Sequence, residues 1–160
     1  MSQNTIAVID LGTNTFHILI AEVTEPHNYR IVHRLRIPVM IGKGGINQGL
    51  ITEEGQERAL AALQQFAALI RQYEVQQVRA TATSAFRNAR NGKALVQRIR
   101  EETGIRIEVI DGMQEAEYIF GGVQEALSLD HEPILIMDIG GGSVEFILSS
   151  DQQVRWKQSF

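Results

Sequence analysis

Two segments of this sequence follow the same plan. IAVIDLGTNTFHILI begins at Ile6, and ILIMDIGGGSVEFIL begins at Ile134. Each has four apolar residues, an aspartate, an apolar residue, a glycine, a short run of small residues and a second apolar stretch. Two apolar runs joined by a short glycine-containing turn predict a β-hairpin. The presence of two such hairpins in one chain indicates duplicated half-domains.

The two hairpins align at the positions that can contact a ligand. The aligned pairs are Asp10 with Asp138, Gly12 with Gly140, and Thr15 with Ser143. Small residues allow backbone N–H groups to converge on an anion, and hydroxyls add donors. An aspartate at the end of a strand can bind Mg²⁺ directly or through water. The alternative is a pair of tight turns in which Asp and Gly serve the backbone alone, but Gly140–Ser143 contains more glycine than a turn requires.

Strands and helices alternate between the two hairpins. The apolar pattern predicts a third strand over 29–40, and Thr52 followed by Glu53 and Glu54 predicts a helix start. Asp111 with Gln114 resembles a capping box, so another helix should begin near residue 112. Its apolar stripe is Ala116, Ile119, Phe120, Val123 and Leu127. The other predicted elements are strands 75–80, 105–110, 134–137, 144–148 and 153–160, and a helix over 92–103. This order predicts an α/β fold with a mixed sheet.

The composition narrows the function classes. The chain has 160 residues, a formal net charge of -4 and no cysteine. Without a concentrated basic patch we expect no binding to nucleic acid or to a membrane surface. The missing cysteines exclude disulfides and thiolate metal sites. The N-terminus has no basic signal-peptide region, and no apolar stretch approaches the ~20 residues of a membrane span. We therefore expect a soluble cytoplasmic protein.

Paired D-x-G hairpins are typical of the actin-like ATPase superfamily, which includes actin, Hsp70 chaperones and sugar kinases. Within it, the sequence resembles the exopolyphosphatase/guanosine pentaphosphate phosphatase (Ppx/GppA) family. The matching segments are DLGTNTFH at 10–17, ATSAFRNA at 82–89, Glu115-Ala116 with Gly122-Val123, and DIGGGSVE at 138–145. The resemblance implies a ribonuclease H-like fold in residues 1–122 and the opening strands of a second, incomplete copy in 123–160. Family members continue well past Phe160, so we expect a shortened chain that hydrolyses little by itself.

The resemblance makes Glu115 the general base that activates the attacking water. Glu115 directly precedes Ala116 of the apolar stripe, so its carboxylate should lie at the border of the buried face, where desolvation raises a carboxyl pKa. The alternative is an ordinary glutamate in a first helical turn, favoured there by the helix dipole.

The family's magnesium ligands fall on Asp138 and Glu145, with Asp10 as a further direct or indirect ligand. Glu145 is the one charge in the apolar run 144–148, and charges are seldom buried in a strand without a partner or a metal. The alternative is an exposed sheet face. The expected cofactor is Mg²⁺ or Mn²⁺.

The same resemblance implies a phosphate site built from both glycine loops and from residues 84–87. The residues concerned are Gly12, Thr13, Asn14, Thr15, Ser84, Arg87, Gly140, Gly141, Gly142 and Ser143. Arg87 would hold a phosphate in bidentate fashion. The alternative is that Ser84 is a simple helix N-cap and Arg87 a surface residue.

The implied activity is hydrolysis of a terminal phosphoanhydride, with polyphosphate or guanosine pentaphosphate as substrate and the full-length protein as a homodimer. Mg²⁺ would neutralise charge while Glu115 directs a water in line with the leaving group. Two other classes stay open. An actin-like ATPase or kinase would need an adenosine-binding element, and a non-catalytic module would bind polyphosphate or the alarmone without releasing phosphate.

Overall fold

The chain forms two compact units. The computed structural model describes residues 4–25, 28–127, 129 and 131–160. Contacts divide the chain into unit 1, Met1–Val109, and unit 2, Ile110–Phe160. The boundary that we predicted after residue 122 falls inside a helix, Gly112–Ala126, and that helix packs on the strands that follow it.

Unit 1 contains a five-stranded mixed sheet in the order β3-β2-β1-β4-β5. The strands are β1 Asn4–Leu11, β2 Thr15–Glu25, β3 Asn28–Pro38, β4 Gln77–Ala82 and β5 Glu108–Val109. β1, β2 and β3 are antiparallel, whereas β4 runs parallel to β1 and β5 parallel to β4. The mixed sheet is therefore confirmed. The strand predicted over 105–110 is only two residues long, because it pairs with β4 only at Thr81 and Ala82.

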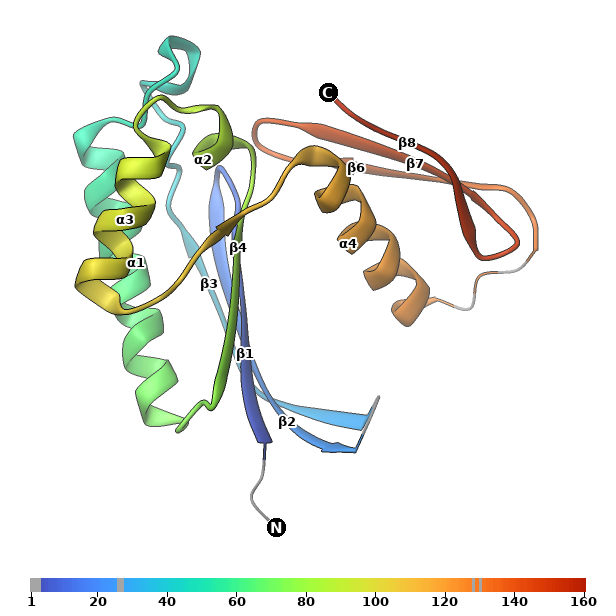
Figure 1. Ribbon diagram of the computed structural model, residues 1–160, viewed down its shortest axis with the longest axis horizontal. Helices are drawn as coiled ribbons and strands as arrows, with labels where there is room; N and C mark the ends of the chain where they lie inside the picture. Colours follow the sequence, from blue (N-terminus) through green and yellow to red (C-terminus); the bar gives the residue numbers. More distant parts are fainter. Residues whose placement is uncertain (1–3, 26–27, 128, 130) are drawn as a thin grey trace. The chain divides into compact units, whose positions relative to one another are not determined.

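Two long helices cover one face of this sheet, α1 (Glu53–Gln72) and α3 (Gly92–Thr103) (Figure 1). The short elements η1 (Ile46–Gln48) and α2 (Ser84–Asn88) precede them in turn. Ile9, Leu11, Phe16, Leu63 and Phe66 are fully buried between sheet and helices. None of the helices in the described ranges has the length and apolar content that a membrane crossing needs.

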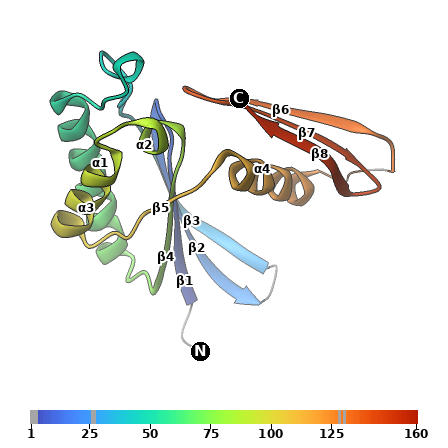
Figure 2. The same cartoon turned by 45° about the horizontal axis from the view of Figure 1, so that its top comes forward.

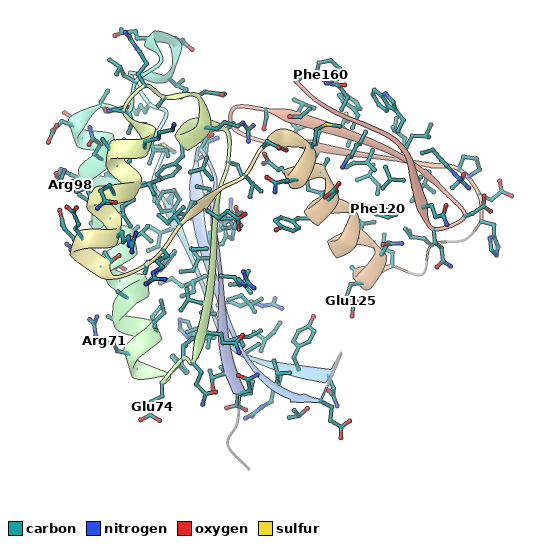
Figure 3. The ribbon with its side chains drawn as sticks, in the orientation of Figure 1. Arg71, Glu74, Arg98, Phe120, Glu125 and Phe160 are labelled. Atoms are coloured by element: carbon teal, nitrogen blue, oxygen red, sulfur yellow. The ribbon has the colours of Figure 1, made fainter. Side chains whose placement is uncertain are left out.

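The ends of both long helices are fixed locally. The Thr52 hydroxyl accepts a hydrogen bond from the Gly55 N–H at 3.2 Å and so caps α1 as predicted. Gly104 ends α3 with a φ of 75°, the left-handed conformation in which glycine is favoured. Arg98 on α3, labelled in Figure 3, forms ion pairs with Glu57 on α1 and with Glu102. The hydrogen bonds within these ion pairs raise the pKa of Arg98, and the one to Glu57 has the larger effect.

Unit 2 is one helix on a three-stranded antiparallel sheet. Its elements are α4 Gly112–Ala126, β6 Ile134–Ile139, β7 Val144–Ser150 and β8 Gln153–Ser159 (Figure 2). Ala116 and Phe120 of α4 are buried against Ile147 of β7. The predicted stripe extends one position too far, because α4 ends at Ala126 and Leu127 is 59% exposed.

The other face of the unit 2 sheet is apolar and open. The register places Leu135 beside Leu148, and Leu148 beside Trp156, in one row across the three strands. All three side chains are exposed, as are Met137 and Ile139 on β6. The small buried core of unit 2 therefore lies only between α4 and the opposite sheet face.

Candidate functional site

The two D-x-G loops close with the same hydrogen bond. In unit 1 the Gly12 N–H donates to the Thr15 carbonyl at 3.1 Å, and in unit 2 the Gly140 N–H donates to the Ser143 carbonyl at 3.0 Å. A Cβ at Gly12 would lie 3.1 Å from the Thr15 carbonyl oxygen, and one at Gly140 would lie 3.2 Å from that of Ser143. Both approaches are tight enough to favour glycine. The duplication read from the sequence is thus present in the backbone.

The flanking strands repeat the same register. Asp10 is the cross-strand partner of His17, and Asp138 is the cross-strand partner of Glu145. His17 and Glu145 therefore occupy equivalent places in the two hairpins. His17 is exposed on β2, whereas Glu145 is fully buried on β7.

Neighbouring backbone holds the first loop in place. The Thr13 carbonyl accepts from the Ile41 N–H at 3.0 Å, and the Asn14 carbonyl accepts from both Val39 and Met40 at 2.9 Å. Gly42 passes so close that a Cβ there would lie 2.9 Å from the Thr13 methyl group. These hydrogen bonds fix the first loop against residues 39–41.

Ser84 is part of this loop's support. The hydroxyls of Thr13 and Ser84 are 3.0 Å apart and both residues are buried. Thr83, rather than Ser84, is the N-cap of α2, so the reading of Ser84 as a simple cap is wrong. Arg87 lies in the same five-residue helix and is half-buried. The structure therefore brings together Thr13 of the first loop and Ser84, two of the predicted phosphate ligands.

In unit 2, Glu145 is a buried carboxylate with unequal oxygens. Its Oε1 accepts a hydrogen bond from the Ser159 hydroxyl at 2.7 Å, and its Oε2 is buried with no hydrogen-bond partner in the part of the chain that the structure describes. A buried charge with one unsatisfied oxygen is costly. This finding removes the alternative of an exposed sheet face for Glu145.

The donor set around Glu145 fits a hard divalent cation. Asp138 is exposed on the neighbouring strand, directly opposite Glu145, so two carboxylates share this place in the sheet. Carboxylate oxygens are the ligands that Mg²⁺ prefers. Within the described ranges no three acidic or histidine side chains gather closely enough to hold a metal ion. Asp10, the third predicted ligand, belongs to unit 1.

Glu115 lies in the first turns of α4, as predicted. The Asp111 carboxylate accepts from the N–H groups of Met113 and Gln114, and the Gln114 side chain accepts from the Asp111 N–H, which completes the predicted capping box. Glu115 is partly buried and directly precedes the fully buried Ala116. The expected position at the border of the buried face is confirmed.

Sequence reasoning missed two residues of unit 2 that contact this set. Ser159 holds Glu145, and Lys157 contacts the first turns of α4. Both contacts depend on the pairing of β8 with β7 and on the packing of α4, which no local pattern encodes. The remaining predicted residues, Gly141 and Gly142, are exposed in the second loop.

Residues 19–160 match the model of the Ppx/GppA phosphatase family. The chain belongs to this family. An exopolyphosphatase from Cytophaga hutchinsonii is 47% identical to this Ppx/GppA chain, with a TM-score of 0.94 over 98% of this chain and 50% of that one. The Ppx/GppA family member of Aquifex aeolicus is 28% identical, with a TM-score of 0.82 over 98% and 50%.

One curated relative is also an exopolyphosphatase. Exopolyphosphatase 1 of Mycobacterium bovis is 27% identical over 92% of this Ppx/GppA chain and 43% of its own length. The chain thus spans about half the length, or less, of these three relatives. The predicted actin-like ATPase fold is confirmed.

Proposed function

We propose that this Ppx/GppA chain acts in a phosphoanhydride hydrolase, an enzyme that releases terminal phosphate from inorganic polyphosphate, guanosine pentaphosphate, or both. The observation that carries the proposal is the duplicated loop, closed in both units by the same N–H to carbonyl hydrogen bond. Loops of small residues suit anions because their backbone N–H groups can approach the charge. The family and the exopolyphosphatase relatives support a phosphatase of this kind.

Each unit supplies a loop and its own side chains to phosphate binding. In unit 1 the proposed donors are Thr13, Asn14, Thr15, Ser84 and Arg87, and in unit 2 they are Gly141, Gly142 and Ser143. Gly12 and Gly140, whose N–H groups donate within their own loops, would line the phosphate site as residues without a side chain. Arg87 adds a positive charge that can pair with two phosphate oxygens. The Thr13 to Ser84 contact keeps the hydroxyls of unit 1 in place.

A divalent cation, Mg²⁺ or Mn²⁺, completes the proposal. Asp138 on β6 and Glu145 on β7 would hold it, and Asp10 on β1 stays a candidate for a further ligand. The buried, unsatisfied Oε2 of Glu145 supports this assignment. When bound, the cation neutralises phosphate charge that develops during phosphoryl transfer.

Glu115 is the proposed general base. It takes a proton from water as the water oxygen attacks the terminal phosphorus, and the bond from that phosphorus to the bridging oxygen breaks. The products are orthophosphate and a substrate shorter by one phosphate. Its partly buried place in a capped helical turn supports this role, since a general base must be held in a fixed orientation.

The test is magnesium-dependent phosphate release by the full-length gene product from long polyphosphate, guanosine pentaphosphate and ATP, measured in parallel with equilibrium binding of each. We expect release from one or both of the first two. Glu115→Gln should lower the rate by about 10²- to 10⁴-fold, because general-base catalysis contributes about that factor, while binding is kept. Glu125→Gln, an exposed change near the other end of α4 (Figure 3), is the matched control.

Three other outcomes would contradict the proposal. Release from ATP alone would indicate an actin-like ATPase or kinase. Binding of polyphosphate or alarmone without any release would indicate a sensor module. A Glu115→Gln variant with near-normal turnover would refute the role of Glu115 as base.

A further inference from the structure

Lys157 is a largely buried cation on β8. Its side chain is 18% exposed, whereas that of Arg155 on the same strand is 46% exposed. The Lys157 ammonium donates a hydrogen bond to the Met113 carbonyl at 3.2 Å and forms an ion pair with Glu117. Met113 and Glu117 are both in α4, two residues before and two residues after Glu115.

Helix stabilisation does not explain this placement. The N-terminal end of a helix carries partial positive charge, so a cation there is electrostatically unfavourable. The end of α4 is already capped by the reciprocal hydrogen bonds of Asp111 and Gln114. Immobilising a lysine also costs side-chain entropy. The contacts of Lys157 do one other thing, which is to attach the turn that carries Glu115 to β8.

The same strand also holds the buried carboxylate. Side chains two residues apart on a strand share a face of the sheet, and Ser159 lies two residues beyond Lys157. Ser159 donates to Glu145, while Lys157 contacts α4. β8 therefore contacts Glu145, a proposed metal ligand, and the turn of α4 that carries Glu115, the proposed base.

We propose that Lys157 is a positioning residue that anchors the first turns of α4 to β8 and thereby fixes the orientation of the Glu115 carboxylate. This inference rests on the proposed function, because it takes Glu115 as the base. Lys157 acts through Glu115 and is given no contact with substrate.

The test compares Lys157→Met, which keeps the length of the side chain and removes its charge and donors, with Lys157→Arg, which keeps both. Arg155→Met is the matched control on the same strand, because Arg155 contacts only Ser150 and Asp151 among the hydrogen bonds recorded for described residues. We expect Lys157→Met to lower kcat by about 10- to 100-fold, the effect of a small misplacement of a catalytic group. KM should change less than about twofold, because no substrate contact is lost.

Lys157→Arg should recover most of kcat, and Arg155→Met should leave both constants within about twofold of the unsubstituted chain. A rise in KM with unchanged kcat would mean that Lys157 binds substrate, and this would overturn the proposal. Unchanged kcat in a folded Lys157→Met variant would overturn it too.

Amide hydrogen exchange gives a second reading that needs no turnover. In Lys157→Met, exchange at residues 115–120 of α4 should become faster, and in Arg155→Met it should not. Unchanged exchange there would overturn the anchoring role. Failure of the unsubstituted full-length protein to release phosphate would instead refute the proposed function, so the two failures are distinguishable.

Discussion

Among single residues, Glu145 has the most demanding environment in unit 2. It is fully buried, Ser159 satisfies one of its oxygens, and the other has no partner among the described residues. Taking a carboxylate out of water is expensive, and one hydrogen bond does not offset that cost. A cation at Oε2 would offset it, and for this reason stability and metal binding should be linked at this residue.

We expect Glu145→Gln to raise the free energy of unfolding by about 1 kcal/mol in the absence of divalent cations, because a neutral amide is less costly to bury than an unsatisfied charge. Mg²⁺ should raise the Tm of the unsubstituted chain, since a ligand that binds only the folded state stabilises it, and should not raise that of the variant. Urea and thermal unfolding with and without Mg²⁺ measure both effects.

Ser159→Ala is the companion change and should act in the opposite direction. It leaves both oxygens of Glu145 without a hydrogen bond, so the free energy of unfolding should fall by about 1–3 kcal/mol without metal. Equal Mg²⁺ stabilisation in the unsubstituted chain and in Glu145→Gln would show that the cation binds elsewhere.

The sequence identifies some of these residues and misses others for a physical reason. Glu145 was recognisable because a charge interrupts an apolar strand, which is a local pattern. Ser159 was not, because its contact depends on the register between β7 and β8. The contact of Ser84 with Thr13 was not predictable for the same reason, since the two residues are 71 positions apart in the sequence.

Among the elements, the junction of α2 with α3 depends on a glycine with no room for a side chain. Gly92 is the first residue of α3, and a Cβ there would lie 2.0 Å from the Phe86 carbonyl oxygen of α2. The obstacle is backbone, which cannot rotate away as a side chain can. Any side chain at position 92 must therefore displace α2, the helix that carries Ser84 and Arg87.

We expect Gly92→Ala to lower the free energy of unfolding by about 1–3 kcal/mol, as overpacking does, and to weaken phosphate binding through the shift of α2. Gly121→Ala is the contrasting change, because nothing lies within 4 Å of a Cβ there and the residue is inside α4. It should raise the free energy of unfolding by about 0.5–1 kcal/mol. Chemical denaturation compares the two, and a stabilising Gly92→Ala would contradict the argument.

Helix ends were predictable to within a residue or two because their signals are local. Thr52, Gly104 and Asp111 mark ends in the sequence by capping chemistry alone. The strand over 105–110 was overestimated, because strand length is set by the partner and β4 pairs with it at only two positions. Existence and type of the longer elements thus follow from pattern, whereas the extent of a strand follows from tertiary pairing, and the short η1 was not predicted.

For the whole molecule, the two units have very unequal cores. Unit 1 buries apolar side chains from β1, β2, α1 and α3 in one continuous cluster. In unit 2 the buried apolar cluster found among the described residues consists of Ala116, Phe120 and Ile147, and one sheet face is open. A small core gives a small margin of stability.

Hydrogen exchange should therefore be slow in β1, β2 and α1 and much faster in α4 and β6–β8, because local opening costs less where fewer apolar groups are buried. Exchange measured by mass spectrometry on peptides from each unit checks this. Equal protection in the two units would mean that unit 2 is stabilised by contacts beyond its own core.

The equivalent places of His17 and Glu145 have a consequence for the duplicated architecture. The imidazole opposite Asp10 adds no second carboxylate to the first hairpin. A second carboxylate opposite Asp138 repels it instead, and like charges across a strand pair are destabilising until a cation lies with them. A single cross-strand position thus adds a second carboxylate to the hairpin of unit 2 and none to the hairpin of unit 1, so a bound cation should stabilise the second hairpin more than the first.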